Sequence, residues 1–358
     1  MKTVKELLCF ESEKDLFSIK FRGAPVWMYL REGSCEDAVK VTPPGVKVSF
    51  ISLWRSLFMT IKFTLLSKKS DVFIISNRRE LVLFRDNVNP AGFTFMFDEK
   101  NQKNSNILLF LVARLILRKL SYLFVFKEYR TIQSRLVSTG LNNRFISEGV
   151  RKTIGDYFFI RALDLIFSER TIYHSAPVVP GNLRFIRNLN ANYNEIQHGV
   201  IHCSHLGYVG IPKVFTKLHV YHKSYLKILN SMSYVGLVHV SNWLKEEKEK
   251  EQYKKVVFTQ PIPEFQLLVR NMLKSDAQLL VQPHPRDDFD YGVLPSRIVS
   301  INSIFEVENP IFFSSSLIEK CLINDKSFYL VTLNLATFES HFETYRQYHN
   351  FDRLAVYL

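Results

Sequence analysis

Short apolar runs of strand length alternate with longer helical patterns along most of the chain. In the first half these runs are rich in β-branched and aromatic residues and are bounded by polar and turn residues, which is typical of buried strands. The predicted strands of this block are 71–76, 91–97, 170–174, 195–197, 214–221 and 236–240. A helical pattern over 145–167 precedes the third of them. Alternating strands and helices predict a parallel, doubly wound sheet.

The same alternation restarts at Lys255 and predicts a second α/β unit. The predicted strands here are 256–260, 276–282, 297–301, 311–313 and 328–333, the last of which is expected to close the sheet. The resulting domains are a Rossmann-like domain over 1–253, a second Rossmann-like domain over 254–335, and a C-terminal helix in 336–358 that can cross back to the first domain.

Two further segments, 51–69 and 107–126, combine helical apolar spacing with interleaved cations. The cations are Arg55, Lys62, Lys68, Lys69, Arg114, Arg118 and Lys119. Neither segment is an uninterrupted apolar stretch of about 20 residues, so neither is expected to span a membrane. One interpretation is a pair of basic faces on anionic lipid. The other is a pair of core-packing helices with Lys and Arg turned outward.

Composition describes a folded globular protein with a strong positive charge. Of the 358 residues, 47% are hydrophobic and 23% charged, and the net charge is +13. Such an excess favours nucleic acid, an acidic membrane surface or a phosphorylated substrate. We expect no nucleic-acid partner, because zinc-finger spacing, RNP-like runs and basic tails are missing from the sequence. Four scattered cysteines and the charged start without a signal-peptide pattern favour a cytoplasmic protein.

The second block carries two motifs that suit a phosphate. His284 stands between two prolines, which stiffen the backbone around it, and Arg286 is the nearest cation. Ser314, Ser315 and Ser316 follow a predicted strand and lead into a predicted helix, where hydroxyls and free backbone N–H groups can bind an anion. The alternatives are a structural turn histidine and a simple helix N-cap.

The first block carries the motif Glu195-Ile-Gln-His198-Gly-Val, followed by His202 and His205. His198 and His202 have the spacing of metal ligands on a helix, but the intervening Gly and β-branched residues argue against such a helix. No third ligand has recognisable spacing, so we expect no metal. The favoured interpretation is that an imidazole or carboxylate takes a proton from an attacking hydroxyl.

Several common signatures are missing from the sequence. There is no GxSxG, Walker or GxGxxG motif, which removes the usual support for hydrolase, NTPase and dinucleotide-oxidoreductase functions. Asp288-Phe289-Asp290 has the DxD form of metal-dependent sugar transferases. It follows His284 within a polar loop, and we interpret it as a solvated acidic loop.

Together these motifs resemble bacterial surface-polysaccharide glycosyltransferases of the GT-B fold. The order is Glu195–Val200 with His205-Leu-Gly-Tyr208, then Gln282-Pro-His284-Pro285, then Ser314-Ser315-Ser316. Sialyltransferases, polysialyltransferases and capsule Kdo transferases share the HP and serine motifs. The glycerophosphotransferases of teichoic acid synthesis, which use CDP-glycerol, show a similar order. The resemblance covers roughly residues 170 to 320 and departs from the sialyltransferase pattern in having no clean acidic D/E-D/E-G motif.

The resemblance implies two Rossmann-like doubly wound domains facing across a cleft, with 1–253 as the acceptor-side domain and 254–335 as the nucleotide-binding domain. It also implies an inverting, metal-independent and cofactor-free transfer of a sialic or Kdo-like sugar from a CMP donor to a lipid-linked or oligosaccharide acceptor. His198 or Glu195 would be the base, and the open choice between them follows from the missing acidic motif. The phosphate site would comprise His284, Pro285, Arg286, Ser314, Ser315 and Ser316, and the acceptor site His202, His205 and Tyr208.

Two other functions remain open from the sequence. One is a phosphotransferase of a cell-surface polymer that uses CDP-glycerol or a nucleotide sugar, and the other is a non-catalytic protein of polysaccharide assembly. The expected location is the cytoplasm, with peripheral binding at the anionic inner leaflet of the cytoplasmic membrane.

Overall fold

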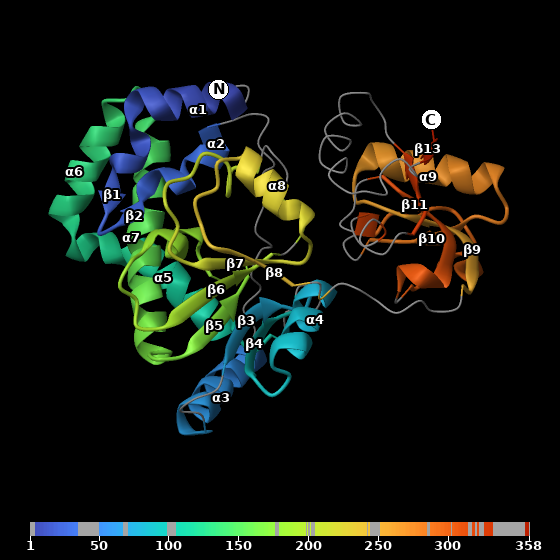
Figure 1. Cartoon of the computed structure of the whole chain (residues 1–358), viewed down its shortest axis with the longest axis horizontal. Helices are drawn as coiled ribbons and strands as arrows, with labels where there is room; N and C mark the ends of the chain where they lie inside the picture. Colours follow the sequence, from blue (N-terminus) through green and yellow to red (C-terminus); the bar gives the residue numbers. More distant parts are fainter. Residues whose placement is uncertain are drawn as a thin grey trace. The chain divides into compact units, whose positions relative to one another are not determined.

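The computed structural model divides into two compact units, Met1–Trp243 and Leu244–Leu358 (Figure 1). Each unit contains its own parallel sheet, so the mixed α/β class predicted from the strand and helix pattern is confirmed. The described residues are 4–34, 50–66, 71–98, 105–175, 179–197, 199, 201, 205–241, 243, 251–284, 287–301, 303–313, 317–318, 321, 326–331 and 355–357.

Six parallel strands form the sheet of the first unit, in the order β4-β3-β5-β6-β7-β8. Their bounds are β3 Val72–Ser76, β4 Phe93–Phe97, β5 Thr171–His174, β6 Asn192–Ile196, β7 Lys217–Val220 and β8 Val238–Val240. The chain adds β4 on one side of β3 and all later strands on the other. The strand order therefore reverses between β3 and β5, which is where open α/β sheets bind ligands.

Helices cover both faces of this sheet. On one face, Phe84 of α4 (Arg79–Val88) packs against Tyr173, which stacks on Phe73. On the other face, Val72, Ile74 and Ile172 share a core with α5 and α7. The other described helices of the unit are α1 Val4–Lys14, α2 Arg31–Ser34, α3 Phe50–Leu66, α5 Leu108–Phe124, α6 Phe126–Val137, α7 Asn143–Ile166 and α8 Ser224–Ser231. The unit also contains the 3-10 turns η1 Leu16–Ser18, η2 Val26–Tyr29 and η4 Gly181–Phe185. Strands β1 Lys20–Phe21 and β2 Ala24–Pro25 form a separate antiparallel pair.

Helix α5 packs closely against α7 around a buried carboxylate. Asp156 of α7 is fully buried and pairs with Arg114 at 2.9 Å and with Arg118 at 2.6 Å. The expectation that the cations of this segment face outward is therefore wrong for these two arginines. A buried carboxylate needs charged or hydrogen-bonding partners, and α5 supplies them by turning its arginines inward.

Five parallel strands form the sheet of the second unit, in the order β10-β9-β11-β12-β13. Their bounds are β9 Tyr253–Phe258, β10 Leu280–Gln282, β11 Val307–Phe312, β12 Tyr329–Val331 and β13 Ala355–Tyr357, and the unit also contains α9 Pro263–Ser275, η5 Pro295–Arg297 and η6 Ile304–Glu306. Alternating residues divide between two cores. Val256 and Phe312 belong to one, whereas Val257 and Ile311 belong to the other, together with Val269 of α9.

Two details of the second unit differ from the sequence prediction. The predicted strand at 297–301 is wrong, because Ile298 makes only an isolated bridge to Val281. The Arg297 guanidinium instead binds the carbonyls of Leu273, Asp276 and Leu279 around the end of α9. The segment at 328–333 does not close the sheet, since β13 pairs in parallel with β12.

The two units divide the chain close to the predicted domain boundary. The units divide after Trp243, ten residues before the boundary predicted after Tyr253, where β9 begins. Of the predicted C-terminal helix at 336–358, only Ala355–Tyr357 are described, and they form β13 of the second sheet. No helix within the described ranges combines the length and apolarity needed to cross a bilayer.

Candidate functional site

The HP motif at His284 and the strand before the serine run (Ser314 to Ser316) end at the same edge of the second sheet, on either side of β9. Because β9, β10 and β11 are parallel, their carboxyl ends lie along the same edge. The register aligns Gln282 with Phe258, and Phe258 with Phe312. His284 therefore follows one neighbour of β9, and the serine run begins just after Phe313 on the other neighbour. This edge is where ligands bind in open α/β sheets.

The backbone at His284 is fixed by two hydrogen bonds. Its N–H donates to Thr259 Oγ1 at 2.9 Å, and its carbonyl accepts from the Asp287 N–H at 2.8 Å. Thr259 directly follows β9, so the turn after β10 is attached to the central strand of the edge. The half-buried His284 thus stands on a rigid support, as a phosphate-binding side chain requires.

Asp287 anchors this turn and was not singled out from the sequence. Its carboxylate accepts from Gln266 Nε2 at 2.7 Å, from the Tyr291 hydroxyl at 2.5 Å and from Thr259 Oγ1. Burial opposes ionisation of Asp287, but the hydrogen bonds from Thr259, Tyr291 and Gln266 outweigh it and lower its pKa below the ordinary value. The spacing of Asp287 three residues after His284 was the available signal, but its partners lie in other elements.

The remaining predicted residues of this edge are Pro285, Arg286, Ser314, Ser315 and Ser316, and they lie outside the described residues. The DxD triplet is described. Its Asp290 accepts a hydrogen bond from the Gly292 N–H at 2.8 Å, an ordinary turn contact. Among the described residues no three His, Cys, Asp or Glu side chains are grouped so that they could hold a metal ion.

In the first unit, Glu195 lies buried in β6 as half of an ion pair. Arg184 of η4 donates from Nη2 to one carboxylate oxygen at 2.6 Å, and its Nε lies 2.6 Å from the other. The buried Tyr208 hydroxyl donates to the first oxygen at 3.0 Å. Burial lowers the pKa of Arg184, but the Glu195 charge and hydrogen bond, together with Tyr208 and Tyr234, outweigh burial and raise the pKa overall. Both carboxylate oxygens are therefore engaged in holding the loops around β6.

The predicted acceptor residues lie partly in the same cluster. His205 accepts a hydrogen bond at Nδ1 from the Gly207 N–H at 3.2 Å, and its ring packs against Tyr208 at 4.9 Å between centroids. Burial and the Glu195 charge raise the pKa of Tyr208, so its hydroxyl stays protonated. His198 and His202 lie outside the described residues. The structure thus brings Glu195, His205 and Tyr208 together around Arg184, a residue that the sequence did not indicate.

Buried hydroxyls end the two strands at which the order of the first sheet reverses. Ser76 ends β3, and Ser175 directly follows β5. Both are fully buried, and neither hydroxyl oxygen has a hydrogen-bond partner among the described residues. Sequence patterns gave no signal for them, because a serine at the end of an apolar run resembles any strand terminus.

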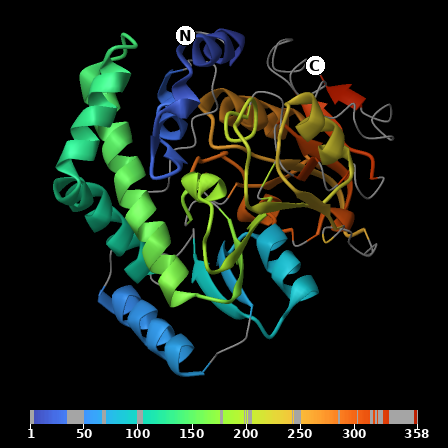
Figure 2. The ribbon, with the colours of Figure 1, turned by 60° about the vertical axis from the view of Figure 1, so that its left-hand side comes forward.

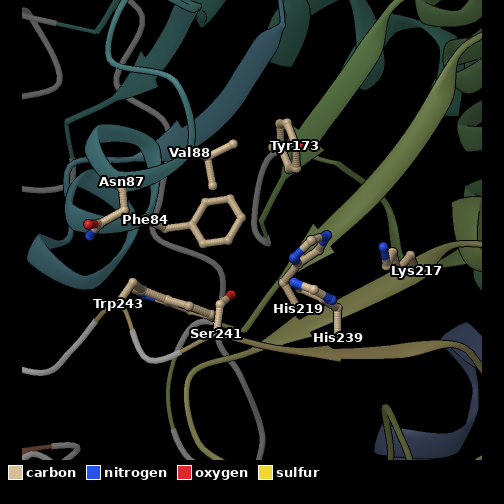
Figure 3. Close-up of a pocket in the computed structure, with 9 residues that line it drawn as sticks. All are labelled: Phe84, Asn87, Val88, Tyr173, Lys217, His219, His239, Ser241 and Trp243. Atoms are coloured by element: carbon tan, nitrogen blue, oxygen red, sulfur yellow. The ribbon is translucent and has the colours of Figure 1, made fainter.

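A pocket of about 470 Å³ lies on the sheet face covered by α4 (Figure 3). Its lining residues are Phe84, Asn87, Val88, Tyr173, Lys217, His219, His239, Ser241 and Trp243. In Figure 3 the rings of His219 and His239 lie side by side, with Phe84 and Val88 of α4 across from them. Aromatic walls with imidazole and ammonium groups suit a ring that carries polar or anionic substituents.

His219 is the most perturbed group of this pocket. It is buried, and its Nε2 lies 3.3 Å from Asn194 Oδ1. Burial, followed by the neighbouring His239 and Lys217, lowers the pKa of His219 to about 4. The imidazole is therefore neutral at physiological pH.

Comparison with protein families and with curated proteins identifies no relative of the chain, since no family model and no curated protein matches it. Functional inference therefore rests on the motifs and on the geometry of the two sheet edges.

Proposed function

We propose that the protein is an inverting, metal-independent glycosyltransferase of cell-surface polysaccharide synthesis with the GT-B arrangement of its two units. The donor would be a CMP-activated acidic sugar and the acceptor an oligosaccharide. The observation that carries the proposal is the position of the HP motif and of the strand preceding the serine run on either side of β9, at one carboxyl edge.

The donor phosphate is the group that this edge suits. In the proposed reaction an acceptor oxygen forms a bond to the anomeric carbon, while the bond from that carbon to the phosphate oxygen breaks. The electron pair leaves with CMP, so negative charge grows on the phosphate. The His284 imidazole and the hydroxyls of Ser314, Ser315 and Ser316 would donate hydrogen bonds there, and donors placed in advance lower the barrier.

For the base we favour His198 over Glu195. Arg184 and Tyr208 already engage both oxygens of the Glu195 carboxylate inside the first unit. Proton uptake by Glu195 would leave the Arg184 charge buried without its counter-charge, which is energetically costly. Histidine near its ordinary pKa is well suited to accept the proton of an attacking hydroxyl at neutral pH.

The test is a transfer assay with CMP-, UDP-, GDP- and CDP-linked donors. We expect transfer from a CMP-sugar, retained in EDTA, and near-complete loss in His284→Ala. Asp288→Asn is the matched control, since Asp288 is exposed in the same loop, and it should keep its activity. A strict UDP or GDP requirement would refute the CMP assignment, and loss of activity in EDTA or in Asp288→Asn would restore the DxD metal interpretation.

Two other outcomes would replace the proposal. A product that keeps phosphorus in the new linkage, detected by phosphorus NMR, would identify a phosphotransferase using a CDP or UDP donor. Unchanged polymer synthesis in His284→Ala would indicate a non-catalytic assembly protein. Because a lipid-linked acceptor must be reached at a membrane, the proposed location is the cytoplasm at the inner leaflet.

A further inference from the structure

Helix α3 has apolar residues on both its buried and its exposed sides: Phe63 belongs to the core, and Leu53 and Met59 pack against that core. Its buried face includes Ser52 and Ser56, both with no exposed surface. The Ser56 hydroxyl accepts a hydrogen bond from the Leu109 N–H at 3.0 Å and so joins α3 to the first turn of α5. Its exposed face carries large apolar residues, namely Phe50, Ile51, Trp54, Leu57, Phe58 and Ile61.

These outward residues form one continuous stripe. They recur at spacings of three and four, so they lie on the same side of the helix. Their exposure is large, with Phe50 at 74%, Phe58 at 65% and Trp54 at 57%. In Figure 2, α3 is the blue helix at the margin of the first unit. A contiguous apolar surface of this kind marks an interaction site.

The charges on α3 indicate the nature of the partner. The helix contains no Asp or Glu, and its two cations, Arg55 and Lys62, are both exposed. Helix α5, against which α3 packs, also contains no acidic residue. It directs Arg114 and Arg118 inward to Asp156 and leaves Leu123 and Phe124 exposed. An aromatic stripe accompanied only by cations is complementary to an anionic lipid surface.

We propose that α3 lies in the plane of an anionic membrane surface, with Phe50, Trp54 and Phe58 inserted below the headgroups. Arg55 and Lys62 then lie at headgroup level, where lipid phosphates neutralise them. The helix is 17 residues long and binds the interface without crossing it. This inference goes beyond the proposed reaction and does not depend on which group the enzyme transfers.

Trp54 provides a direct probe of insertion. The chain has three tryptophans, and Trp27 and Trp243 are buried. On addition of phosphatidylglycerol-containing vesicles, we expect a blue shift of tryptophan emission and quenching by brominated acyl chains. Trp54→Phe should abolish both signals while leaving vesicle binding largely intact. Pure phosphatidylcholine vesicles should bind more weakly, and added salt should weaken the binding to anionic vesicles.

Paired variants distinguish insertion from other uses of the stripe. The double variant Trp54→Gln/Phe58→Gln should weaken co-sedimentation with anionic vesicles by at least about tenfold, because two large apolar side chains no longer enter lipid. Leu165→Gln, at 73% exposure on α7, is the matched control and should bind as the wild type does. Arg55→Glu/Lys62→Glu should lose the preference for anionic lipid.

Three results would overturn the proposal: wild-type protein that ignores anionic vesicles at low salt, a double variant that binds them normally, or Trp54 emission unchanged on binding. A concentration-dependent dimer that the double variant abolishes, without vesicle binding, would instead assign the stripe to a second copy of the chain. Failure of the glycosyltransferase proposal is separable, because transfer to a water-soluble acceptor should be the same in wild type and double variant.

Discussion

Individual buried residues in the first unit serve either structure or a candidate site, and their partners distinguish the two roles. Glu195 and Asp156 are buried carboxylates with arginine partners, so their charges are compensated within the fold. Removal of one partner from such a pair strongly destabilises a protein. Ser76 and Ser175 have no such partners among the described residues and end strands at the position where the sheet order reverses. Within the described part of the chain, these two hydroxyls therefore lack the internal compensation that the two carboxylates have.

His219 makes the stability of the first unit depend on pH. Burial lowers its pKa from 6.5 to about 4, so the unfolded chain takes up this proton at a higher pH than the folded protein does. Above pH 6.5 the His219 ring is neutral in both states and does not reduce the free energy of unfolding. As the pH falls from 6.5 towards 4, the ring gains a proton in the unfolded chain but not in the folded protein, and the free energy of unfolding falls. At about 1.4 kcal/mol per pKa unit, the difference between 6.5 and about 4 amounts to roughly 3.5 kcal/mol, most of which is lost by pH 4. We expect His219→Gln to show less destabilisation between pH 7 and pH 4.5 in urea unfolding.

The His219 resonances measured by NMR should titrate near pH 4. His239→Gln is the neighbouring control, since His239 is exposed and is a smaller cause of the shift than burial. It should move the His219 titration only slightly and leave the acid destabilisation in place. A His219 titration near pH 6.5 would refute both the lowered pKa and the burial of this ring.

At the scale of elements, the close approach of α5 and α7 depends on Gly155. A methyl group at this position would lie 2.4 Å from Arg118 Cα and 2.5 Å from Arg118 N, both of which are backbone atoms. Gly155→Ala should therefore separate the helices and disturb the pairing of Arg118 with Asp156. Despite the better helix propensity of alanine, we expect a net loss of about 1–3 kcal/mol in urea unfolding.

Gly181→Ala is the control for this substitution. A methyl group on Gly181 would meet no atom within 4 Å. Its unfolding midpoint should stay close to that of the wild type. Equal stability of Gly155→Ala and wild type would mean that the backbones of α5 and α7 are far enough apart at Gly155 to admit a methyl group.

The sequence predicted elements better than it predicted partners. Compact β-branched runs such as 71–76 predicted β3 nearly to the residue, because a fully buried parallel strand leaves a clear pattern. The run at 297–301 has the same character but is not a strand, since Arg297 binds carbonyls around α9. That choice depends on tertiary contacts, which a local pattern cannot contain.

For the candidate site residues, too, the position along the chain was predicted better than the side-chain partners. The motif at His284 was predicted at a strand end and is described there, just beyond β10. The engagement of Glu195 by Arg184 could not be predicted, because the two residues come from different elements joined by a loop. The apolar spacing of α3 was visible, but which face is buried depends on the fit of Ser56 against α5.

At the scale of the whole molecule, each unit has its own sheet and its own core residues. Units of this kind are able to unfold in separate steps, so thermal unfolding need not be two-state. We expect two transitions, and Gly155→Ala should lower the one that belongs to the first unit. This variant thereby identifies which transition reports on which unit.

CMP should then stabilise the second unit selectively, because the His284 edge belongs to that unit's sheet. A ligand that binds only the folded state at 100 times its Kd adds about 2.7 kcal/mol. For a unit of this size, that corresponds to a rise of roughly 10 °C in its unfolding temperature. Differential scanning calorimetry with CMP, UMP and GMP would measure it, and His284→Ala should remove the CMP effect. If CMP instead raised the transition that Gly155→Ala lowers, the nucleotide would bind the first unit, and the assignment of the donor phosphate to the His284 edge would be wrong.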